Sequence, residues 1–293
     1  MQLSVVVLNW NAGADTAACV RSVRAWEGVA RPEIWVVDNG SREAEVEALA
    51  RECPDVHLVR NSINRGFSGG NNLGIEDALA TGTEAVLLLN NDARLDAAGL
   101  AAMLETLASD AAIGFVGPTV WHGGRCISAG GRDIALHQVT HLRPRELPAT
   151  PFDVDYVPGT VVLIRREVFE FVGFLDDAYF FGGELADLCL RARRRGFRSV
   201  TDPRARATHD LERSAHDREV LHLYYIARNR FLFVRKHYRR LAPLLYARWI
   251  ARGAFMAVAA AVRGRPKAAR AVTLGVLDGV SGRFGGRNER ILA

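Results

Sequence analysis

The chain has 293 residues, 49% of them hydrophobic and 24% charged, which is ordinary for a soluble globular protein and long enough for one large α/β domain or two smaller ones. Its four scattered cysteines show no CxxC spacing, which argues against a disulfide framework or structural zinc site and favours a reducing cytoplasm. The net charge of +5 is unevenly divided, since residues 191–293 hold 24 of the 38 Lys and Arg but only 7 of the 33 Asp and Glu. This basic part predicts an anionic partner, such as nucleic acid, a phosphorylated substrate or acidic lipid.

The first third of the chain alternates strand-like and helix-like segments. Strands are predicted at 3–10, 33–41, 56–61 and 84–92, and helices at 14–26, at 42–52 and from the Gly- and Asn-rich stretch 64–74 to about residue 80. This alternation is typical of an α/β protein with a mostly parallel, doubly wound sheet, which binds ligands at the carboxyl ends of its strands. Asn9, Asp38 and Asp92 fall at such ends, so we expect them to converge. The N-terminus lacks the basic region of a signal peptide.

The remaining elements are less regular. The predictions are loops with a hairpin at 120–155, a strand and helix start at 157–169, a helix at 184–196, a last strand at 197–203 and helices over 216–262. Residues 244–280 mix apolar and basic side chains, without the roughly 18–20 charge-free apolar residues of a membrane-spanning helix. They predict either a basic amphipathic helix on an anionic membrane or a helix pair packed on the rest of the protein.

The stretch LLLNNDARL at 87–95 runs from a buried strand into Asn90, Asn91 and Asp92. A capping turn is one interpretation. The other is a metal site, because Mg²⁺ and Mn²⁺ take oxygen ligands and bridge phosphate oxygens to one or two carboxylates. One aspartate is too few for a protein-only cage, so a substrate diphosphate would have to complete the coordination shell.

Other candidate residues each have a structural and a functional interpretation. Asp38 either caps the next helix or accepts a hydrogen bond from a nucleotide. Glu184 and Asp187 open a predicted helix, where the macrodipole favours acids, but a carboxylate after the aromatic, Gly-rich DDAYFFGG stretch can also be a general base. His209 has no second metal ligand at local spacing. The Gly-rich stretch is not a Walker A loop, and no GxGxxG follows the first strand, which disfavours a Rossmann dehydrogenase.

Taken together, an ordered set of segments resembles a known family. The segments are VVVLNWN, VVDNGS, NRGFSGGNNLG, LLLNNDARL, VPGTVVLIRREVFEFVGFLDDAYFF, ELADLCLRARRRGF, THD and YYIARNRFLFVRKHY. They cover nearly the whole chain and resemble the inverting family 2 glycosyltransferases with the GT-A fold, especially bacterial rhamnosyltransferase-like members. The resemblance implies a GT-A catalytic domain over 1–215, with a nucleotide-binding half at about 1–118 and an acceptor half at about 119–215, followed by a helical, basic region at 216–293.

The resemblance also implies roles for particular residues. Asp92 would bind the Mg²⁺ or Mn²⁺ that holds the donor diphosphate, as the last acid of a DXD-type motif, and His209 would lie near the metal and the phosphates. The nucleotide of a UDP- or dTDP-sugar would be bound by Asn9, Asp38, Asn64, Arg65, Gly66, Asn71, Asn90 and Asn91.

One departure from the family concerns the catalytic base. The family usually has an adjacent Glu-Asp pair, whose second acid is the base, where this chain has Glu184 and Leu185. Leu185 cannot accept a proton, so Glu184 or Asp187 takes the role, or activity is lost. We favour Glu184, because Asp187 lies a turn further into the helix.

The implied function is metal-dependent, inverting transfer of a sugar such as rhamnose from a nucleotide-sugar to a hydroxyl group. The acceptor would be a glycan, a lipid-linked glycan or a small molecule in polysaccharide or glycolipid synthesis, in the cytoplasm or on the inner face of the plasma membrane. The alternative is a non-catalytic homologue that binds sugar nucleotides. A nucleic-acid partner is not expected, since the chain lacks HTH, zinc and RNP-type signatures and its N-terminal part is acidic.

Overall fold

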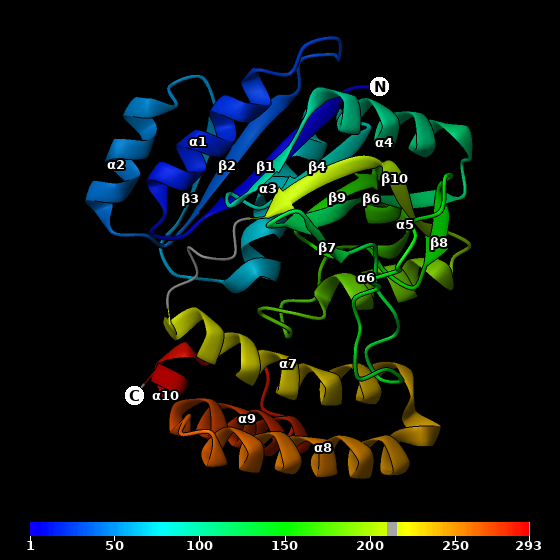
Figure 1. The fold of residues 1–293 in the computed structure, drawn as a ribbon. Helices are drawn as coiled ribbons and strands as arrows, with labels where there is room; N and C mark the ends of the chain where they lie inside the picture. Colours follow the sequence, from blue (N-terminus) through cyan, green and yellow to red (C-terminus); the bar gives the residue numbers. More distant parts are fainter. Residues whose placement is uncertain (210–215, 293) are drawn as a thin grey trace.

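The computed structural model describes residues 1–209 and 216–292. In this part of the chain, helices flank a central sheet, and a layer of C-terminal helices lies below it (Figure 1). The strands are β1 (Leu3–Asn9), β2 (Glu33–Asn39), β3 (His57–Asn61), β4 (Ala85–Leu89), β5 (Ala93–Leu95), β6 (Ile113–His122), β7 (Arg125–Ser128), β8 (Phe152–Val154), β9 (Val161–Arg165) and β10 (Arg198–His209). The helices are α1 (Gly13–Arg24), α2 (Glu43–Glu52), α3 (Gly66–Ala80), α4 (Ala97–Ser109), α5 (Arg166–Val172), α6 (Glu184–Arg193), α7 (His216–His237), α8 (Ala242–Val262), α9 (Pro266–Val280) and α10 (Asn288–Leu292), with a 3₁₀ turn, η1 (Arg239–Leu241).

The sheet is parallel in its first half and mixed in its second. Its order is β3-β2-β1-β4-β9-β6-β10-β5, with β7 beside β6 and β8 beside β10. Strands β1 to β4 are parallel to one another because α1, α2 and α3 each return the chain to the same end of the sheet. By contrast, β9 runs antiparallel to both β4 and β6. The register sets Asn9 beside Asp38, so polar residues at the ends of β1 and β2 are neighbours.

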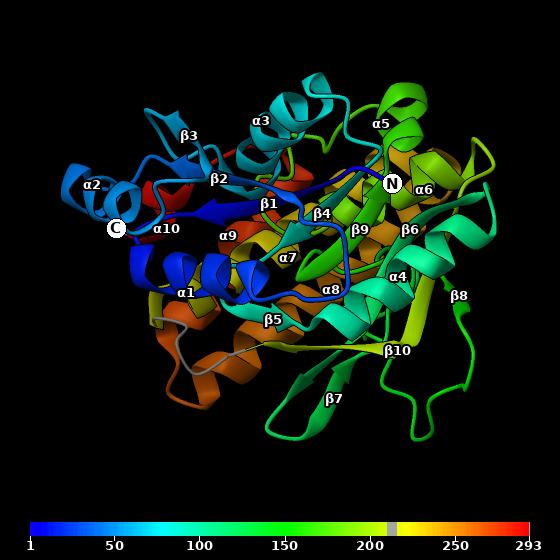
Figure 2. The same cartoon turned by 90° about the horizontal axis from the view of Figure 1, so that it is seen from above.

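Alternate residues of the strands face two different helical layers, as the pleat of a strand requires. Val5 and Val7 pack with residues of α1 and α4 on one face, while Val6 packs with residues of α3 and α6 on the other. Figure 2 shows the two layers from above, with the strands between them. The hydrophobic core therefore lies on both faces and leaves the carboxyl ends of the parallel strands for a site.

Two details differ from the sequence-based expectation. Helix α3 already begins at Gly66, so most of the Gly- and Asn-rich stretch is helical. The helical region predicted over 216–262 is interrupted at Tyr238 and η1, after which α8 packs against α7 and α9 (Figure 1). The predicted domain boundary at 215 lies outside the described residues.

Candidate functional site

A buried polar network joins the carboxyl ends of β1, β2 and β4. Asn9 donates a hydrogen bond from Nδ2 to Asp38 Oδ1 at 2.9 Å, and the backbone N–H of Ser41 donates to Asp38 Oδ2 at 3.1 Å. The Thr16 hydroxyl donates to Asn9 Oδ1 at 2.8 Å and accepts from Asn91 Nδ2 at 3.0 Å. Because these side chains are buried, the network holds three strand ends in one fixed arrangement.

A second group of predicted residues surrounds the start of α3, where Asn39 organises the chain. Asn39 Nδ2 donates to Asn64 Oδ1 at 3.1 Å and to the Gly66 carbonyl oxygen at 3.0 Å. Its Oδ1 accepts the N–H of Arg65 at 3.0 Å. Gly66 adopts a φ of +73°, and a Cβ there would lie 2.3 Å from the Phe180 carbonyl oxygen, so glycine is required. Sequence reasoning missed Asn39, although a second polar residue at a strand end was a usable signal.

The other two residues of this predicted group point elsewhere. Asn71 is buried and donates from Nδ2 to the Phe67 carbonyl oxygen at 2.8 Å. Arg65 has an exposed side chain, whose Nη2 lies 3.6 Å from a carboxylate oxygen of Asp177. Asn71 therefore stabilises the first turn of α3, while the Arg65 guanidinium stays at the surface.

The turn after β4 places Asp92 beside His209. Strands β5 and β10 pair antiparallel with Ala93 opposite His209, so the residue before Ala93 reaches the end of β10. Asp92 Oδ1 and His209 Nε2 lie 3.1 Å apart, and both side chains are largely buried. Asn90 flanks them, with its backbone N–H fixed by a 3.0 Å hydrogen bond to the Thr160 carbonyl oxygen. The two predicted metal ligands are therefore adjacent, although 117 positions separate them in the sequence.

A cleft of about 560 Å³ connects this pair to the start of α6. Gly183, with a φ of +102°, turns the chain sharply into the helix, so that Glu184 heads α6 in the wall of the cleft. The residues that line the cleft at its two ends include Asn90, Asp92, His209, Gly182, Gly183, Glu184 and Leu185. An adjoining hollow of about 450 Å³ shares Asp92 and His209 and is lined by Arg94 and Arg206.

Glu184 is a buried carboxyl group whose hydrogen-bonding capacity is only partly satisfied. Its Oε2 atom has no hydrogen-bond partner within the described part of the chain. Burial raises the pKa of Glu184 to about 7, although backbone N–H groups at the head of α6 partly oppose the shift. A carboxyl group with a pKa near neutrality can accept and return a proton at physiological pH.

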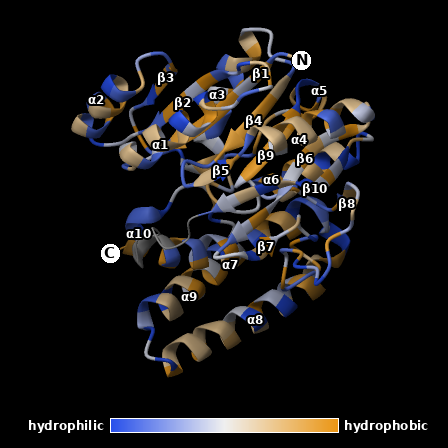
Figure 3. Cartoon of the chain, turned by 45° about the horizontal axis from the view of Figure 1, so that its top comes forward, coloured by the Kyte–Doolittle hydropathy of each residue, from blue (hydrophilic) through white to orange (hydrophobic). Residues whose placement is uncertain are grey.

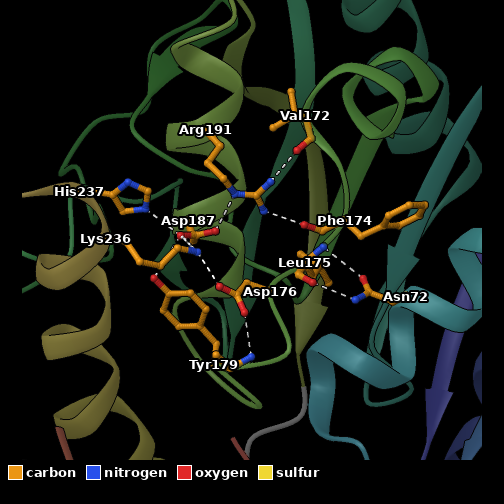
Figure 4. Close-up of polar contacts among 11 residues, drawn as sticks. Asn72, Val172, Phe174, Leu175, Asp176, Tyr179, Asp187, Arg191, Lys236 and His237 are labelled. Carbon is orange, nitrogen blue, oxygen red and sulfur yellow. Dashed lines mark hydrogen bonds and ion pairs between the residues drawn. The ribbon is translucent and has the colours of Figure 1, made fainter. Parts of the chain in front are cut away.

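Asp187 has a different environment, although it lies one turn from Glu184. Figure 4 shows its carboxylate among basic side chains, with Lys236 Nζ at 2.6 Å, His237 Nε2 at 2.7 Å and Arg191 Nε at 2.8 Å. Burial alone would raise the pKa of Asp187, but the hydrogen bond from His237 and the two charges hold it well below its usual range. Asp187 is fully buried and is not among the described residues that line the cleft. Of the two acids, Glu184 therefore lines the cleft, whereas Asp187 is enclosed by basic side chains.

Helix α7 also holds the loop 178–182, just before Glu184, through two buried residues that sequence reasoning left without a role. Arg228 Nη2 donates to two carbonyl oxygens of this loop, at 3.1 and 2.8 Å. Asn229 Nδ2 donates to three, at 3.0, 2.9 and 2.6 Å. The available signal was an Arg-Asn pair inside the apolar segment YYIARNRFLF.

Leu185, where the resemblance led us to expect an acid, is part of the core. It is buried in the main hydrophobic cluster and also lines the cleft. A carboxylate at this position would therefore be enclosed by apolar groups, so Glu184 is the acid that the cleft offers at the head of α6.

Arg230 of α7 adds a cation to the same cleft and links it to α8. Its guanidinium donates to three backbone carbonyl oxygens and lies 3.9 Å from the centre of the Trp249 ring of α8. Burial, together with the charges of Arg248 and Arg252 on α8, lowers the pKa of Arg230 to about 10. One wall of the cleft is thus attached directly to α8.

Comparison with known proteins identifies relatives. The sequence profile described as Glycosyl transferase family 2 matches residues 4–173. The low-salt glycan biosynthesis hexosyltransferase Agl10 of Haloferax volcanii is 28% identical over 198 residues, which span 66% of this chain and 62% of Agl10. The N-acetylglucosaminyl-diphospho-decaprenol L-rhamnosyltransferase of Mycobacterium tuberculosis is 24% identical over 279 residues, or 86% of this chain and 89% of that protein.

A solved structure shares the architecture. The mannosyltransferase PcManGT from Pyrobaculum calidifontis, in complex with GDP-Man and Mn²⁺, superposes with a TM-score of 0.57 at 16% identity, covering 96% of this chain and 88% of that one. This likeness concerns the fold, and it confirms the predicted α/β, GT-A architecture with flanking and C-terminal helices.

Proposed function

The chain belongs to glycosyl transferase family 2, and from this premise we propose that it transfers a glycosyl group from a nucleotide-sugar to a hydroxyl acceptor, with inversion at the anomeric carbon. The observation that carries the proposal is the cleft, because a carboxylate–imidazole pair and a buried carboxyl group with a raised pKa line the same cavity. A single displacement needs these two functions, since one group must stabilise the leaving diphosphate and another must deprotonate the acceptor.

Asp92 and His209 are the residues that we assign to the donor. They supply an oxygen and a nitrogen 3.1 Å apart, which fits a divalent cation that keeps other positions for substrate oxygens. No group of three or more His, Cys, Asp or Glu side chains suited to a metal occurs in the described ranges, so the donor diphosphate would complete the coordination. When bound, Mg²⁺ or Mn²⁺ neutralises charge on the departing diphosphate. Arg94 and Arg206 of the adjoining hollow add positive charge there, and the Mn²⁺ and GDP-Man bound to PcManGT support a cation and a nucleotide-sugar.

Glu184 is the residue that we assign to the acceptor. Its ionised carboxylate takes the proton of the acceptor hydroxyl, and the acceptor oxygen forms a bond to the anomeric carbon. The bond between that carbon and the diphosphate oxygen breaks, and its electron pair leaves with the nucleoside diphosphate. A single displacement of this kind inverts the anomeric centre. The pKa of about 7 suits the carboxylate to this exchange near neutral pH.

The names of the relatives support a class of substrates. One relative is named as a rhamnosyltransferase that acts on a diphospho-decaprenol and another as a hexosyltransferase of glycan biosynthesis. We infer a UDP- or dTDP-linked hexose donor, such as a rhamnose donor, and a glycan or lipid-linked acceptor in polysaccharide or glycolipid synthesis.

A non-catalytic protein that binds sugar nucleotides is the second candidate, and the apolar Leu185 favours it. Glu184 argues for catalysis, because it lines the cleft and its carboxyl group has a raised pKa, and perturbed pKa values of this kind are typical of catalytic acids and bases. The two candidates differ in turnover and agree in donor binding.

The test compares Glu184→Gln with the native protein. A thermal-shift panel of sugar nucleotides with Mn²⁺ first identifies the donor, because a ligand that binds only the folded state raises its stability. Glu184→Gln is then expected to lower kcat by roughly 10²–10⁴-fold with donor affinity unchanged. Glu167→Gln, which removes an acid from the first turn of α5, is the matched control with native kcat. Full turnover by Glu184→Gln would exclude this base, and donor binding by the native protein without turnover on any acceptor would favour the second candidate.

A further inference from the structure

Helix α8 presents an apolar face to the outside of the molecule. In Figure 1, α8 and α9 lie on the far side of α7 from the sheet, and Figure 3 shows that apolar residues dominate both helices. One side of α8, here called its outer face, carries the exposed residues Leu244 (69%), Phe255 (64%), Val258 (64%) and Val262 (82%). Their sequence spacing places them within one stripe of an α-helix.

Basic side chains surround the outer face without acidic ones. Residues 220–277 contain twelve Lys and Arg and no Asp or Glu. By helical geometry, Arg248 and Arg252 lie along one edge of the stripe, and Arg263 and Lys267 are exposed just beyond its end. An apolar stripe bordered by cations is typical of a helix that lies in the interface of an anionic membrane.

We propose that the outer face of α8 binds the surface of an anionic lipid membrane. The helix axis lies parallel to the surface, the apolar side chains enter the boundary of the acyl chains, and the arginines contact lipid phosphates. This surface is separate from the cleft, so the proposal goes beyond glycosyl transfer and does not depend on it.

Two observations favour a helix that lies on the membrane over one that crosses it. The segment Arg239–Val262 has the length and composition of a membrane-crossing helix. Only 17% of its most apolar 18 residues are buried against the rest of the described chain. However, Trp249 is buried on the inner side of α8, where its Nε1 donates to the Ala135 carbonyl oxygen at 3.0 Å. Crossing would break this packing and place Arg248 and Arg252 in hydrocarbon, which is unfavourable for both charges.

Docking through α8 would bring the cleft close to the lipid surface. Arg230 lines the cleft and packs on Trp249 of α8, so the thickness of one helix, about 10–12 Å, separates the cleft wall from the outer face. An amphiphilic acceptor whose lipid stays in the membrane could then present its headgroup to the cleft. This consequence alone rests on the proposed function.

The experiment measures cosedimentation of the full chain with vesicles of phosphatidylcholine, with or without phosphatidylglycerol. Binding is expected only to the anionic vesicles, and added salt should weaken it by screening. Phe255→Glu is expected to weaken binding at least about tenfold, because it removes an apolar anchor and adds a repelled charge. Phe171→Glu is the matched control, since Phe171 on α5 is 62% exposed and lies outside the proposed surface. The double variant Arg263→Gln/Lys267→Gln should lose about fivefold in affinity for the anionic vesicles for each cation removed.

Several outcomes would overturn the proposal. The native protein could fail to bind anionic vesicles, or Phe255→Glu could bind as tightly as Phe171→Glu. Retention in the pellet after alkaline carbonate extraction would indicate a crossing helix. A native dimer that Phe255→Glu converts to a monomer, without vesicle binding, would assign the face to a second copy of the chain. Turnover of Phe255→Glu with a water-soluble acceptor separates this proposal from the proposed function, because loss of membrane binding leaves that turnover unchanged.

Discussion

Replacing Asp187 with asparagine removes the negative charge that holds Lys236, His237 and Arg191 around the first turns of α6. The carboxylate is fully buried, so the variant leaves Arg191 and His237 beside a neutral amide, while Lys236 keeps its ion pair with Asp176 at 2.6 Å. Breaking a buried ion pair by removing one partner costs about 3–5 kcal/mol, whereas an acid that interacts only with the helix dipole contributes about 0.3–1 kcal/mol. We therefore expect Asp187→Asn to lower the free energy of unfolding by about 3–5 kcal/mol.

Urea unfolding at neutral pH measures this loss, with Glu167→Gln as a control, because Glu167 is also a first-turn acid. The low pKa of Asp187 adds a second test. Its stabilising charge is present above about pH 4, where aspartate in the unfolded chain ionises, and is lost as the pH falls toward the lower pKa of the folded state. The difference in free energy of unfolding between the native protein and Asp187→Asn should therefore be constant near neutral pH and become smaller in acid. The reasoning would be refuted if Asp187→Asn lost no more stability than Glu167→Gln, or if its difference in free energy of unfolding from the native protein stayed the same in acid.

Three further variants test the site. Asp92→Asn should abolish metal-dependent donor binding in calorimetry with the circular dichroism spectrum unchanged, and native Mn²⁺-dependent affinity would remove Asp92 from the site. Because the pKa of Glu184 is raised to about 7, the unfolded chain loses this proton first, and the native protein loses stability as the pH rises from about 4.5 to 7. Glu184→Gln should therefore have a higher melting temperature than the native protein at about pH 8 but not at about pH 4. An equal difference at both pH values would contradict the raised pKa of Glu184. Leu185→Asp should destabilise by roughly 1–3 kcal/mol, because it buries an unpaired polar group, without raising kcat; a rise in kcat would mean that the native chain lacks an effective base.

The parts of the fold that could be predicted are those set by local pattern. Strands β1 and β2 were readable because buried β-branched runs end in polar residues such as Asn9 and Asp38, and alternation with helices predicted the parallel pairing of β1 to β4. Helix α4 was not among the predicted elements, although Leu100, Met103 and Leu107 on its buried side follow helical spacing. The antiparallel course of β9 depends on pairings with distant strands, which no local pattern encodes.

Within the site, the sequence indicated residue types but not their partners. Asp187 looked like a helix-start acid, because two of the three basic groups around it, Lys236 and His237, come from α7, with His237 50 positions later. In the same way, the contact between Asp92 and His209 follows from the pairing of β5 with β10, and only the family resemblance suggested it in advance. Side chains that meet through tertiary packing leave no periodic signal in the sequence.

Helix α7 has a consequence for the engineering of such chains. Lys236 and His237 hold Asp187, Arg228 holds the loop 178–182, and α7 also packs on α9. A chimera that exchanges C-terminal helices with a relative would replace the donors that fix the segment ahead of Glu184. It would also remove two of the three basic groups around the buried carboxylate of Asp187, leaving only Arg191 of α6. A chimera of this kind therefore requires that residues 176–187 and α7 be taken together from the same parent chain.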